Sequence, residues 1–212
     1  MKLHKYRTSY ELNTILIDDI KNDPILYFQG WFKDAENDKN IIEPNAMTLS
    51  TVDEKRKPSS RVVLLKEIRD RNLIFYTNYK SKKGRDISFN PSVSLSFFWP
   101  SLERQVLITG NASKISESDS DEYFDSRPIG SKVGAIISNQ SEEISDFNEL
   151  SSEYNRLIER YKNQKIKRPK HWGGISVNIV DIEFWQGRPN RLHNRVKCKF
   201  LKNKWEIKLL SP

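Results

Sequence analysis

Five short segments with β-strand character follow one another between residues 46 and 115, and this run constrains the fold more than any other feature of the chain. Turn-forming stretches such as 53–58 (DEKRKP) and 90–92 (NPS) separate the segments. The segments are short and apolar or β-branched, and we expect them to form antiparallel strands. The segments are AMTLSTV (46–52), SSRVVLLKEI (59–68), NLIFYTN (72–78), SVSLSFFW (92–99) and RQVLITGNASKI (104–115).

Helix-type patterns surround and interrupt these strands. Asp23 is a predicted N-cap with Pro24 at the first helical position, and Ile25, Phe28 and Phe32 follow at helical spacing. Helices are predicted at 9–38, 81–89 and 117–163, the last in two or three pieces broken near Arg127 and Pro128.

Three further strands are predicted at 172–185, 191–200 and 204–210. The order of elements predicts an α+β fold, an antiparallel β-barrel with peripheral helices. A chain of 212 residues suits a single domain spanning 1–212, with an N-terminal arm at about 1–20.

Composition excludes several classes of protein. Aromatic residues make up 11% of the chain, which argues against disorder, and the longest apolar runs are too short to span a bilayer. The N-terminus lacks the apolar core of a signal peptide. The single cysteine, Cys198, excludes an intramolecular disulfide. A cytoplasmic protein is therefore predicted.

The net charge of +8 admits either a nucleic-acid partner or a pocket for small phosphorylated ligands. The eight glycines form neither a G-x-G-x-x-G nor a Walker pattern, so side chains must hold most of any phosphate. The three histidines and the cysteine are too dispersed for a zinc site, and no G-x-S-x-G is present. Metalloenzyme and hydrolase functions are disfavoured, and no metal is expected.

Cationic side chains recur at every second position in NRLHNRV. On a strand, Arg191, His193 and Arg195 would share one face. Phe184 and Trp185 precede them and would form an aromatic wall, which suits a planar anionic ligand because Arg both stacks and binds phosphate. The alternative is an exposed edge strand with solvated cations.

Other candidates for anion binding are spread along the chain. Arg61 and Lys66, five apart on a regular strand, would point to opposite faces unless a bulge lies between them. Ser81 is a predicted cap of a helix that carries Lys82 and Lys83 in its first turn, where an anion would also be stabilised. A surface role is the default for Gln105, and a loop or cap role is the default for Gln140 and Ser141. The remaining candidates for anion binding are Arg7, Tyr10, Tyr76, Thr77, Tyr123, Arg127 and Ser131.

Seven motifs occur in the order and spacing of the pyridoxine 5'-phosphate oxidase family, which the chain resembles from about Arg7 to Pro212. The motif W-Q-x-x-x-x-R-L-H-N-R is highly specific. The resemblance implies an FMN-binding split β-barrel and a homodimer with FMN held between the subunits. The motifs are RVVLLK, FYTNYKSKK, LERQV, YFDSRP, SNQS, WGG and IEFWQGRPNRLHNR.

The resemblance also assigns residues to ligands. Arg191 and His193 would be the catalytic residues at the substrate, and a mobile N-terminal arm would close over the active site with Arg7 and Tyr10. The phosphorylated vitamin would contact Lys66, Tyr123, Arg127, Ser131, Arg191 and His193. FMN would contact Arg61, Val62, Val63, Leu64, Leu65, Lys66, Tyr76, Thr77, Lys82, Lys83, Gln105, Gln140, Ser141, Trp185 and Arg195.

The reaction implied is oxidation of pyridoxine or pyridoxamine 5'-phosphate to pyridoxal 5'-phosphate, with hydride transfer to FMN and reoxidation by O2 to give hydrogen peroxide. Two phosphorylated ligands would account for the many cations without nucleic acid or membrane. Lys82 stands where the family typically has Arg, so FMN is expected to bind less tightly, and Asn194 stands where Asp is common. The alternatives are a related FMN-dependent oxidase or flavin reductase acting on another substrate and, more distantly, a nucleic-acid-binding module.

Overall fold

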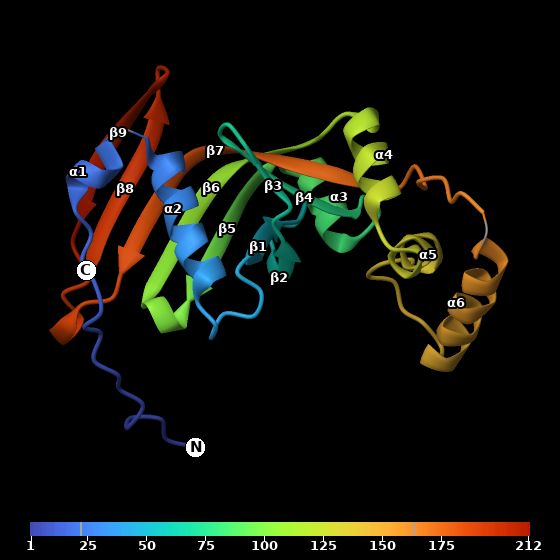
Figure 1. Cartoon of the computed structure of the whole chain (residues 1–212), viewed down its shortest axis with the longest axis horizontal. Helices are drawn as coiled ribbons and strands as arrows, with labels where there is room; N and C mark the ends of the chain where they lie inside the picture. Colours follow the sequence, from blue (N-terminus) through green and yellow to red (C-terminus); the bar gives the residue numbers. More distant parts are fainter. Residues whose placement is uncertain (22, 163) are drawn as a thin grey trace.

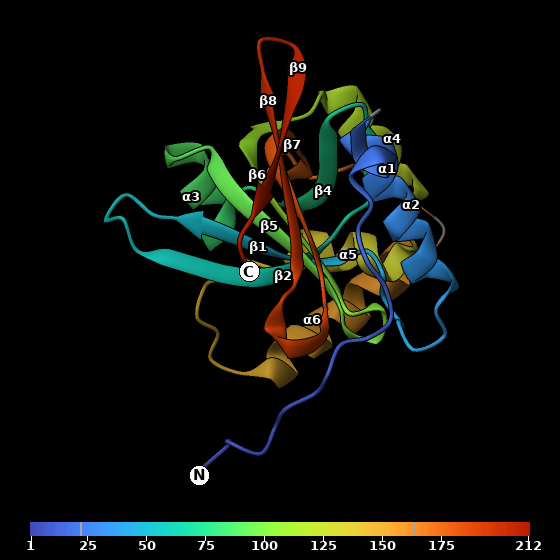
Figure 2. The same cartoon turned by 90° about the vertical axis from the view of Figure 1, so that its left-hand side faces the viewer.

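The computed structural model describes residues 1–21, 23–162 and 164–212, and its centre is a nine-stranded sheet in which every pairing is antiparallel (Figure 1). The main order is β2-β1-β5-β6-β7-β4-β3, and the β8–β9 hairpin pairs with the far part of β7 (Figure 2). The strands are β1 (Ala46–Val52), β2 (Pro58–Leu64), β3 (Glu67–Arg69), β4 (Asn72–Asn78), β5 (Ser92–Trp99), β6 (Arg104–Lys114), β7 (Trp172–Gln186), β8 (Asn194–Leu201) and β9 (Lys204–Leu210).

Helices lie around this sheet. Asp23 caps its helix by accepting a hydrogen bond from the Ile25 N–H, and Ser81 caps the next helix by accepting from the Gly84 N–H, so both predicted caps are confirmed. The helices are α1 (Ile17–Lys21), α2 (Pro24–Asn37), α3 (Lys82–Phe89), α4 (Glu117–Ser126), α5 (Ile129–Ile137) and α6 (Phe147–Tyr161).

The sheet curls because of how its edges are connected. β2 and β3 stand at opposite ends of the main strand order, yet only Leu65 and Lys66 separate them in the chain. The predicted strand over 59–68 is therefore two strands, and the break between them brings the two edges of the sheet together. The fold is the predicted antiparallel split β-barrel with peripheral helices.

Apolar side chains fill the inside of the curl, and α2 packs against them. Leu95, Phe97, Val106 and Ile108 of β5 and β6 are fully buried, as is Phe28 of α2. Alternation of buried and less buried positions along β5 and β6 produces this face, as expected for strands with one side on the core. A second, smaller cluster joins α4, α5 and α6 to the first residues of β7.

The predicted helix over 9–38 is wrong in its first part. Residues 9–16 contain no helix, α1 begins at Ile17, and residue 22 lies outside the described residues. The backbone N–H groups of Leu12 and Ile15 donate instead to the side chains of Glu103 and Asn194. Contacts with distant parts of the chain thus replace the local bonds that a helix would need.

The predicted helical region over 117–163 consists of α4, α5 and α6, with the break at Arg127 and Pro128 where it was expected; residue 163 lies outside the described residues. Within the described ranges, no helix is both long and apolar enough to cross a membrane.

The predicted strand over 191–200 starts three residues late. Pro189–Arg191 forms a short 3-10 turn in which Asn190 and Arg191 have positive φ angles of 56° and 64°, and β8 begins at Asn194. Arg191, His193 and Arg195 therefore do not share a strand face. Phe184 is fully buried in the core, so it forms no wall beside them.

Candidate active site

A cavity of about 620 Å³ lies between the β2 and β4 strands and the α4 and α5 helices. It sits where the edges of the curled sheet meet, beside Lys66 at the break between β2 and β3. Eleven of the residues predicted for the site line it, namely Val62, Val63, Leu64, Lys66, Tyr76, Thr77, Lys83, Tyr123, Arg127, Ser131 and Gln140.

The cavity is cationic. Lys66, Lys83 and Arg127 line it, and none of the described residues that line it is an Asp or a Glu. Arg127 lies at the break between α4 and α5, with its guanidinium carbon 4.3 Å from the centre of the Trp172 ring. Its Nη1 is buried and has no hydrogen-bond partner. Burial lowers the pKa of Arg127, and a buried charged donor of this kind needs an acceptor.

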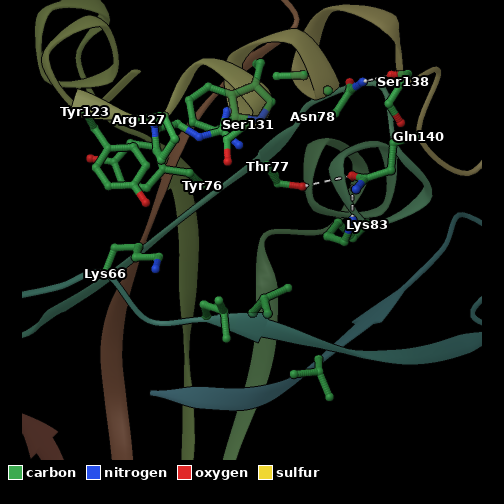
Figure 3. Close-up of a pocket in the computed structure, with 17 residues that line it drawn as sticks. Lys66, Tyr76, Thr77, Asn78, Lys83, Tyr123, Arg127, Ser131, Ser138 and Gln140 are labelled. Carbon is green, nitrogen blue, oxygen red and sulfur yellow. Dashed lines mark hydrogen bonds between the residues drawn. The ribbon is translucent and has the colours of Figure 1, made fainter. Parts of the chain in front are cut away.

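One end of the cavity combines the Arg127 guanidinium with Lys66, Tyr123 and Ser131 (Figure 3). Tyr123 stacks on Tyr76, with ring centres 3.6 Å apart and planes 12° from parallel. Burial raises the pKa of Tyr76 to about 12, and it also raises the pKa of Tyr123. Both hydroxyls therefore keep their protons and can act as hydrogen-bond donors at neutral pH.

The other end of the cavity lies at the first turn of α3 (Figure 3). Lys83 Nζ donates to Gln140 Oε1 at 2.9 Å, and Thr77 Oγ1 donates to the same oxygen at 3.3 Å. The Lys83 residue is 8% exposed. Burial, with repulsion from Arg61, lowers the pKa of this ammonium group to about 8. A buried amine with a lowered pKa is a cation without an anionic partner. Such a group indicates a site where an anion can bind.

Arg61, Lys82 and Ser141 lie beside this end without lining the cavity. The Arg61 guanidinium donates to Thr51 Oγ1 at 2.7 Å, and Lys82 Nζ pairs with Asp86 at 3.1 Å. Ser141 Oγ accepts from the Lys82 N–H at 3.2 Å. Leu65 faces the barrel core, where it is 4% exposed, so it is not at the cavity surface.

A second group of predicted residues lies at the C-terminal end of β7. The rings of Trp185 and His193 are 4.6 Å apart, and the Tyr10 ring lies 5.7 Å from Trp185. Arg195 Nε donates to Glu183 at 2.8 Å. Gln105 is paired with Trp185 across β6 and β7.

His193 accepts a hydrogen bond at Nδ1 from the Arg188 N–H at 3.1 Å. Burial and the nearby Arg191 lower its pKa. The neutral ring then carries its proton on Nε2, which leaves that nitrogen as the available donor. Arg191 and Arg7 are exposed, and Arg7 is in neither group.

The two groups are far apart within one chain. Trp172 lines the cavity and Trp185 belongs to the second group, and both lie on β7 thirteen residues apart. At the rise of a β-strand this separation is on the order of 40 Å. Figure 1 shows β7 running from the side of α4 and α5 to the side of β8. One small ligand cannot contact both groups of the same chain.

Several residues that line the cavity were not singled out as site residues from the sequence. Trp172 belongs to the WGG motif, so the motif itself was a signal. Asn78 follows Thr77 directly at the end of β4. The others come from α5 and the turns on either side of it, which carry no local pattern for ligand binding, and they are Pro128, Gly134, Ala135 and Ser138.

Comparison with known protein families decides the relationship. The family model for pyridoxamine 5'-phosphate oxidase matches residues 34–161, and the model for the pyridoxine 5'-phosphate oxidase C-terminal dimerisation region matches residues 172–212. The chain belongs to the pyridoxamine 5'-phosphate oxidase family. The dimerisation region coincides with β7, β8 and β9, the part of the chain that carries the second group of residues.

Full-length relatives of this family are close in sequence. The pyridoxine/pyridoxamine 5'-phosphate oxidase of Flavobacterium psychrophilum is 49% identical, with 99% of each chain covered. The enzyme of the same name from Leptospira interrogans is 45% identical over 100% of this chain and 99% of its own.

Solved structures share the fold. PhzG from Burkholderia lata, in complex with tetrahydrophenazine-1-carboxylic acid, has a TM-score of 0.89 and 28% identity, covering 97% of this chain and 100% of its own. A pyridoxamine 5'-phosphate oxidase-related, FMN-binding protein from Nostoc punctiforme shares the fold, with a TM-score of 0.71 and 13% identity over 87% of this chain and 97% of its own.

Proposed function

We propose that this protein oxidises pyridoxine or pyridoxamine 5'-phosphate to pyridoxal 5'-phosphate, with FMN as cofactor and O2 as the final acceptor. The relatives that carry this name are 45% to 49% identical and match over nearly the whole chain. The observation that carries the proposal is a cavity that the described lining makes cationic, with no Asp or Glu among the lining residues, in which a buried Arg127 nitrogen has no partner. A phosphorylated ligand supplies the acceptor that this nitrogen lacks.

The residues at the α3 end of the cavity fit the FMN phosphate. Lys83 is buried with a lowered pKa, and Arg61 comes no closer than 3.9 Å to its acidic neighbour Asp86. These cations, together with the first turn of α3, would hold a phosphate. When bound, FMN would supply the redox chemistry, as the acceptor of the hydride that the substrate loses at C4', with O2 as the final acceptor.

The other end of the cavity would hold the substrate. Lys66, Arg127 and Ser131 would donate to the substrate phosphate, and the protonated Tyr123 hydroxyl would add a fourth donor. Anchoring the phosphate here fixes the distance from the substrate's reacting carbon to the flavin, which is the main contribution that a protein makes to such a reaction.

The second group of residues would reach the ligands from another subunit. Trp185 and Arg195 would contact the flavin, and Arg191 and the Nε2–H of His193 would contact the substrate ring. Within one chain this group lies on the order of 40 Å from the cavity, and it belongs to the dimerisation region. A homodimer with FMN at the subunit interface therefore explains why both groups are needed. A single domain with a mobile arm at about 1–20, and a cytoplasmic location, stay predictions from the sequence.

Oxygen uptake by FMN-loaded protein tests this function. We expect uptake with pyridoxine and pyridoxamine 5'-phosphates and formation of pyridoxal 5'-phosphate, which is followed by its absorbance. Protein that retains no FMN after reconstitution, or that turns over neither substrate, would contradict the proposal.

Activity on a different substrate is the second candidate, because the solved structure of PhzG is similar over the whole chain. The same assay with a reduced phenazine carboxylic acid and with unphosphorylated pyridoxine separates the two candidates. Preference for the phenazine would favour the second candidate. The buried Arg127 nitrogen, which lacks an acceptor, instead predicts preference for the phosphorylated vitamin.

A further inference from the structure

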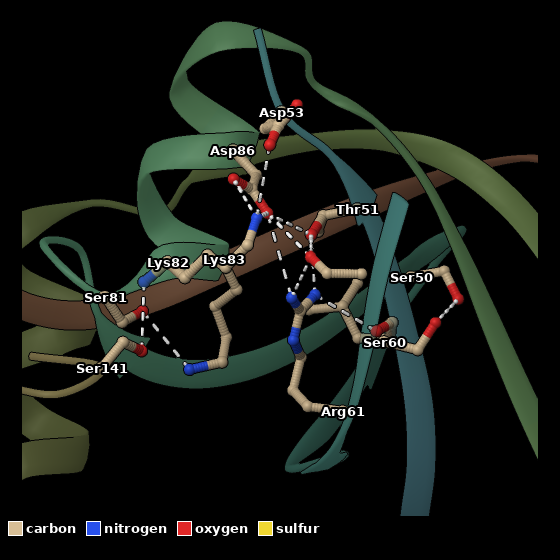
Figure 4. A network of polar contacts seen from close by, with 12 residues as sticks. Ser50, Thr51, Asp53, Ser60, Arg61, Ser81, Lys82, Lys83, Asp86 and Ser141 are labelled. Carbon is tan, nitrogen blue, oxygen red and sulfur yellow. Dashed lines mark hydrogen bonds and ion pairs between the residues drawn. The ribbon is translucent and has the colours of Figure 1, made fainter. Parts of the chain in front are cut away.

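A buried carboxylate lies among the cations at the α3 end of the cavity. Asp86 is 4% exposed, and its Oδ2 accepts from Thr51 Oγ1 at 2.7 Å and from Ser59 Oγ at 3.2 Å. Lys82 Nζ lies 3.1 Å from the same oxygen, and the Arg61 guanidinium lies 3.9 Å from it (Figure 4). Burial alone would raise the pKa of Asp86, but these donors more than offset it, so the carboxylate is charged.

The cluster around Asp86 carries more positive than negative charge. Arg61, Lys82 and Lys83 contribute three cations, and Asp86 is the buried anion among them. Asp53 adds a weaker contact, since it lies 3.8 Å from Lys82 Nζ and its side chain is 24% exposed. Repulsion between Arg61 and Lys83 helps to lower the pKa of Lys83. The positive charge left over is enough to attract a phosphate, but the carboxylate reduces it.

We propose that Asp86 is a specificity-determining residue, the internal counter-ion that sets how strongly this protein prefers a phosphorylated flavin over an unphosphorylated one. The inference rests on the proposed flavin site. Asp86 attracts Lys82 and Arg61 and repels a phosphate dianion at the same cluster. Its charge therefore weakens the binding of FMN, whereas riboflavin, which has no phosphate, is insensitive to it. Lys82 in particular is held by Asp86 rather than free to reach a ligand.

The test compares dissociation constants for FMN and riboflavin, measured by flavin fluorescence on the full-length protein freed of flavin. Asp86→Asn keeps the shape and an acceptor for Thr51 and Ser59 but removes the charge. We expect FMN to bind about tenfold more tightly, with riboflavin unchanged. Asp53→Asn should tighten FMN in the same direction but less, because Asp53 is more exposed, and this variant serves if Asp86→Asn does not fold.

Asp34→Asn is the matched control, because it removes the same charge from a pair with Arg104 that does not line the cavity. It should change neither constant. Equal effects of Asp86→Asn on FMN and riboflavin, or weaker binding of FMN alone, would overturn the inference while leaving the proposed function intact. Wild-type protein that binds neither flavin would overturn the proposed function, and the inference with it.

Discussion

The buried cations of the cavity are the residues whose chemistry depends most on a bound ligand. Arg127 has a buried nitrogen with no acceptor, and Lys83 has a pKa of about 8. Each arrangement costs stability in the protein without ligand, because a charged group is removed from water without full compensation. The chemistry of both residues should therefore change when a phosphorylated ligand binds.

Arg127→Leu should impair binding of the phosphorylated substrate specifically. A charge-assisted hydrogen bond contributes about 1.5–3 kcal/mol, so KM for pyridoxine 5'-phosphate should rise about 10- to 150-fold. Arg156→Leu is the control, because Arg156 is paired with Glu153 on the exposed face of α6. Steady-state kinetics measure both variants. An unchanged KM in Arg127→Leu would remove this residue from the phosphate site.

Because the Lys83 amine has a pKa of about 8, FMN should bind more weakly as the pH rises above that value. A phosphate beside the amine favours its charged form, so binding takes up a proton wherever the free protein has lost it. Affinity should fall by at most about tenfold per pH unit in this range. Lys83→Met should bind FMN weakly at pH 7 and lose this dependence. Fluorescence titration from pH 7 to pH 10 measures it; an equally steep dependence in Lys83→Met would contradict the assignment.

The Lys83 amine should also affect folding stability, but its contribution should increase with pH, whereas the affinity for FMN decreases. Without ligand, the folded protein loses the Lys83 proton near pH 8, whereas the unfolded chain keeps it up to its ordinary value of 10.5. The unfolded state therefore binds more protons between these values, and the contribution of Lys83 to the free energy of unfolding should increase from pH 8 to 10.5. Denaturant unfolding of the wild type relative to Lys83→Met over this range measures the difference.

Among the elements, the N-terminal segment is held by contacts that a helix would not make. Asn194 Oδ1 accepts from Thr14 Oγ1 at 2.7 Å and from the Ile15 N–H at 3.3 Å. Gly187 makes room for the segment, because a Cβ at this position would come within 2.7 Å of the Tyr10 ring. Asn194 thus fixes the segment that places Tyr10 beside Trp185 and His193.

Asn194→Ala should loosen this segment, and Asn194→Asp should not, because a carboxylate oxygen can accept both hydrogen bonds. Loss of bonds worth about 1 kcal/mol in total should speed amide exchange of residues 10–16 several-fold. Hydrogen exchange followed by mass spectrometry measures the effect, with residues 104–114 of β6 as internal control. Equal exchange in Asn194→Ala and wild type would show that other contacts hold the segment.

Gly134 is a residue of α5 at which a larger side chain could enter the cavity. A Cβ added at Gly134 would meet no atom within 4 Å, and the residue lines the cavity. Gly134→Ala should raise the free energy of unfolding by about 0.5–1 kcal/mol, since alanine is the better helix former. Gly134→Leu should keep the fold but fill part of the cavity and weaken flavin or substrate binding. Thermal unfolding and flavin titration measure the two effects separately; tight binding in Gly134→Leu would show that the ligands lie elsewhere.

At the scale of the whole molecule, the distance between the two groups of residues leads to a complementation test. If each site combines the cavity of one subunit with the second group of the other, both sites are impaired in the Arg127→Leu homodimer and in the Arg195→Leu homodimer when the substrate concentration is below the wild-type KM. A mixed dimer keeps one intact site, so refolding the two variants together should restore about a quarter of wild-type activity by random assortment. Failure of the mixture to exceed either variant alone, with mixed dimers demonstrated, would show that the two groups do not combine across the subunit interface.

Much of the fold could be predicted from local patterns. The strand segments between 46 and 115, the caps at Asp23 and Ser81 and the break at Arg127 and Pro128 depend on short-range chemistry. The structure agrees with them, except that the segment over 59–68 is divided into β2 and β3. The errors fall where distant contacts override local preference. Leu12 and Ile15 bond to Glu103, just before β6, and to Asn194 of β8 instead of forming a helix. Asn190 and Arg191 have positive φ angles, so β8 begins only at Asn194.

Motifs and periodicity are local properties, so they were enough to predict the family, the antiparallel barrel and the chemical types of the site residues. How those residues are grouped depends on contacts between distant parts of the chain, and it became visible only in the folded structure. The folded structure separated the cavity from the Trp185 group along the length of β7, which the order of motifs could not reveal. It also showed that Asp86, an ordinary helix residue in the sequence, is buried among the cations of the proposed flavin site. Charge and distance in three dimensions decide such roles, and they depend on how the sheet curls.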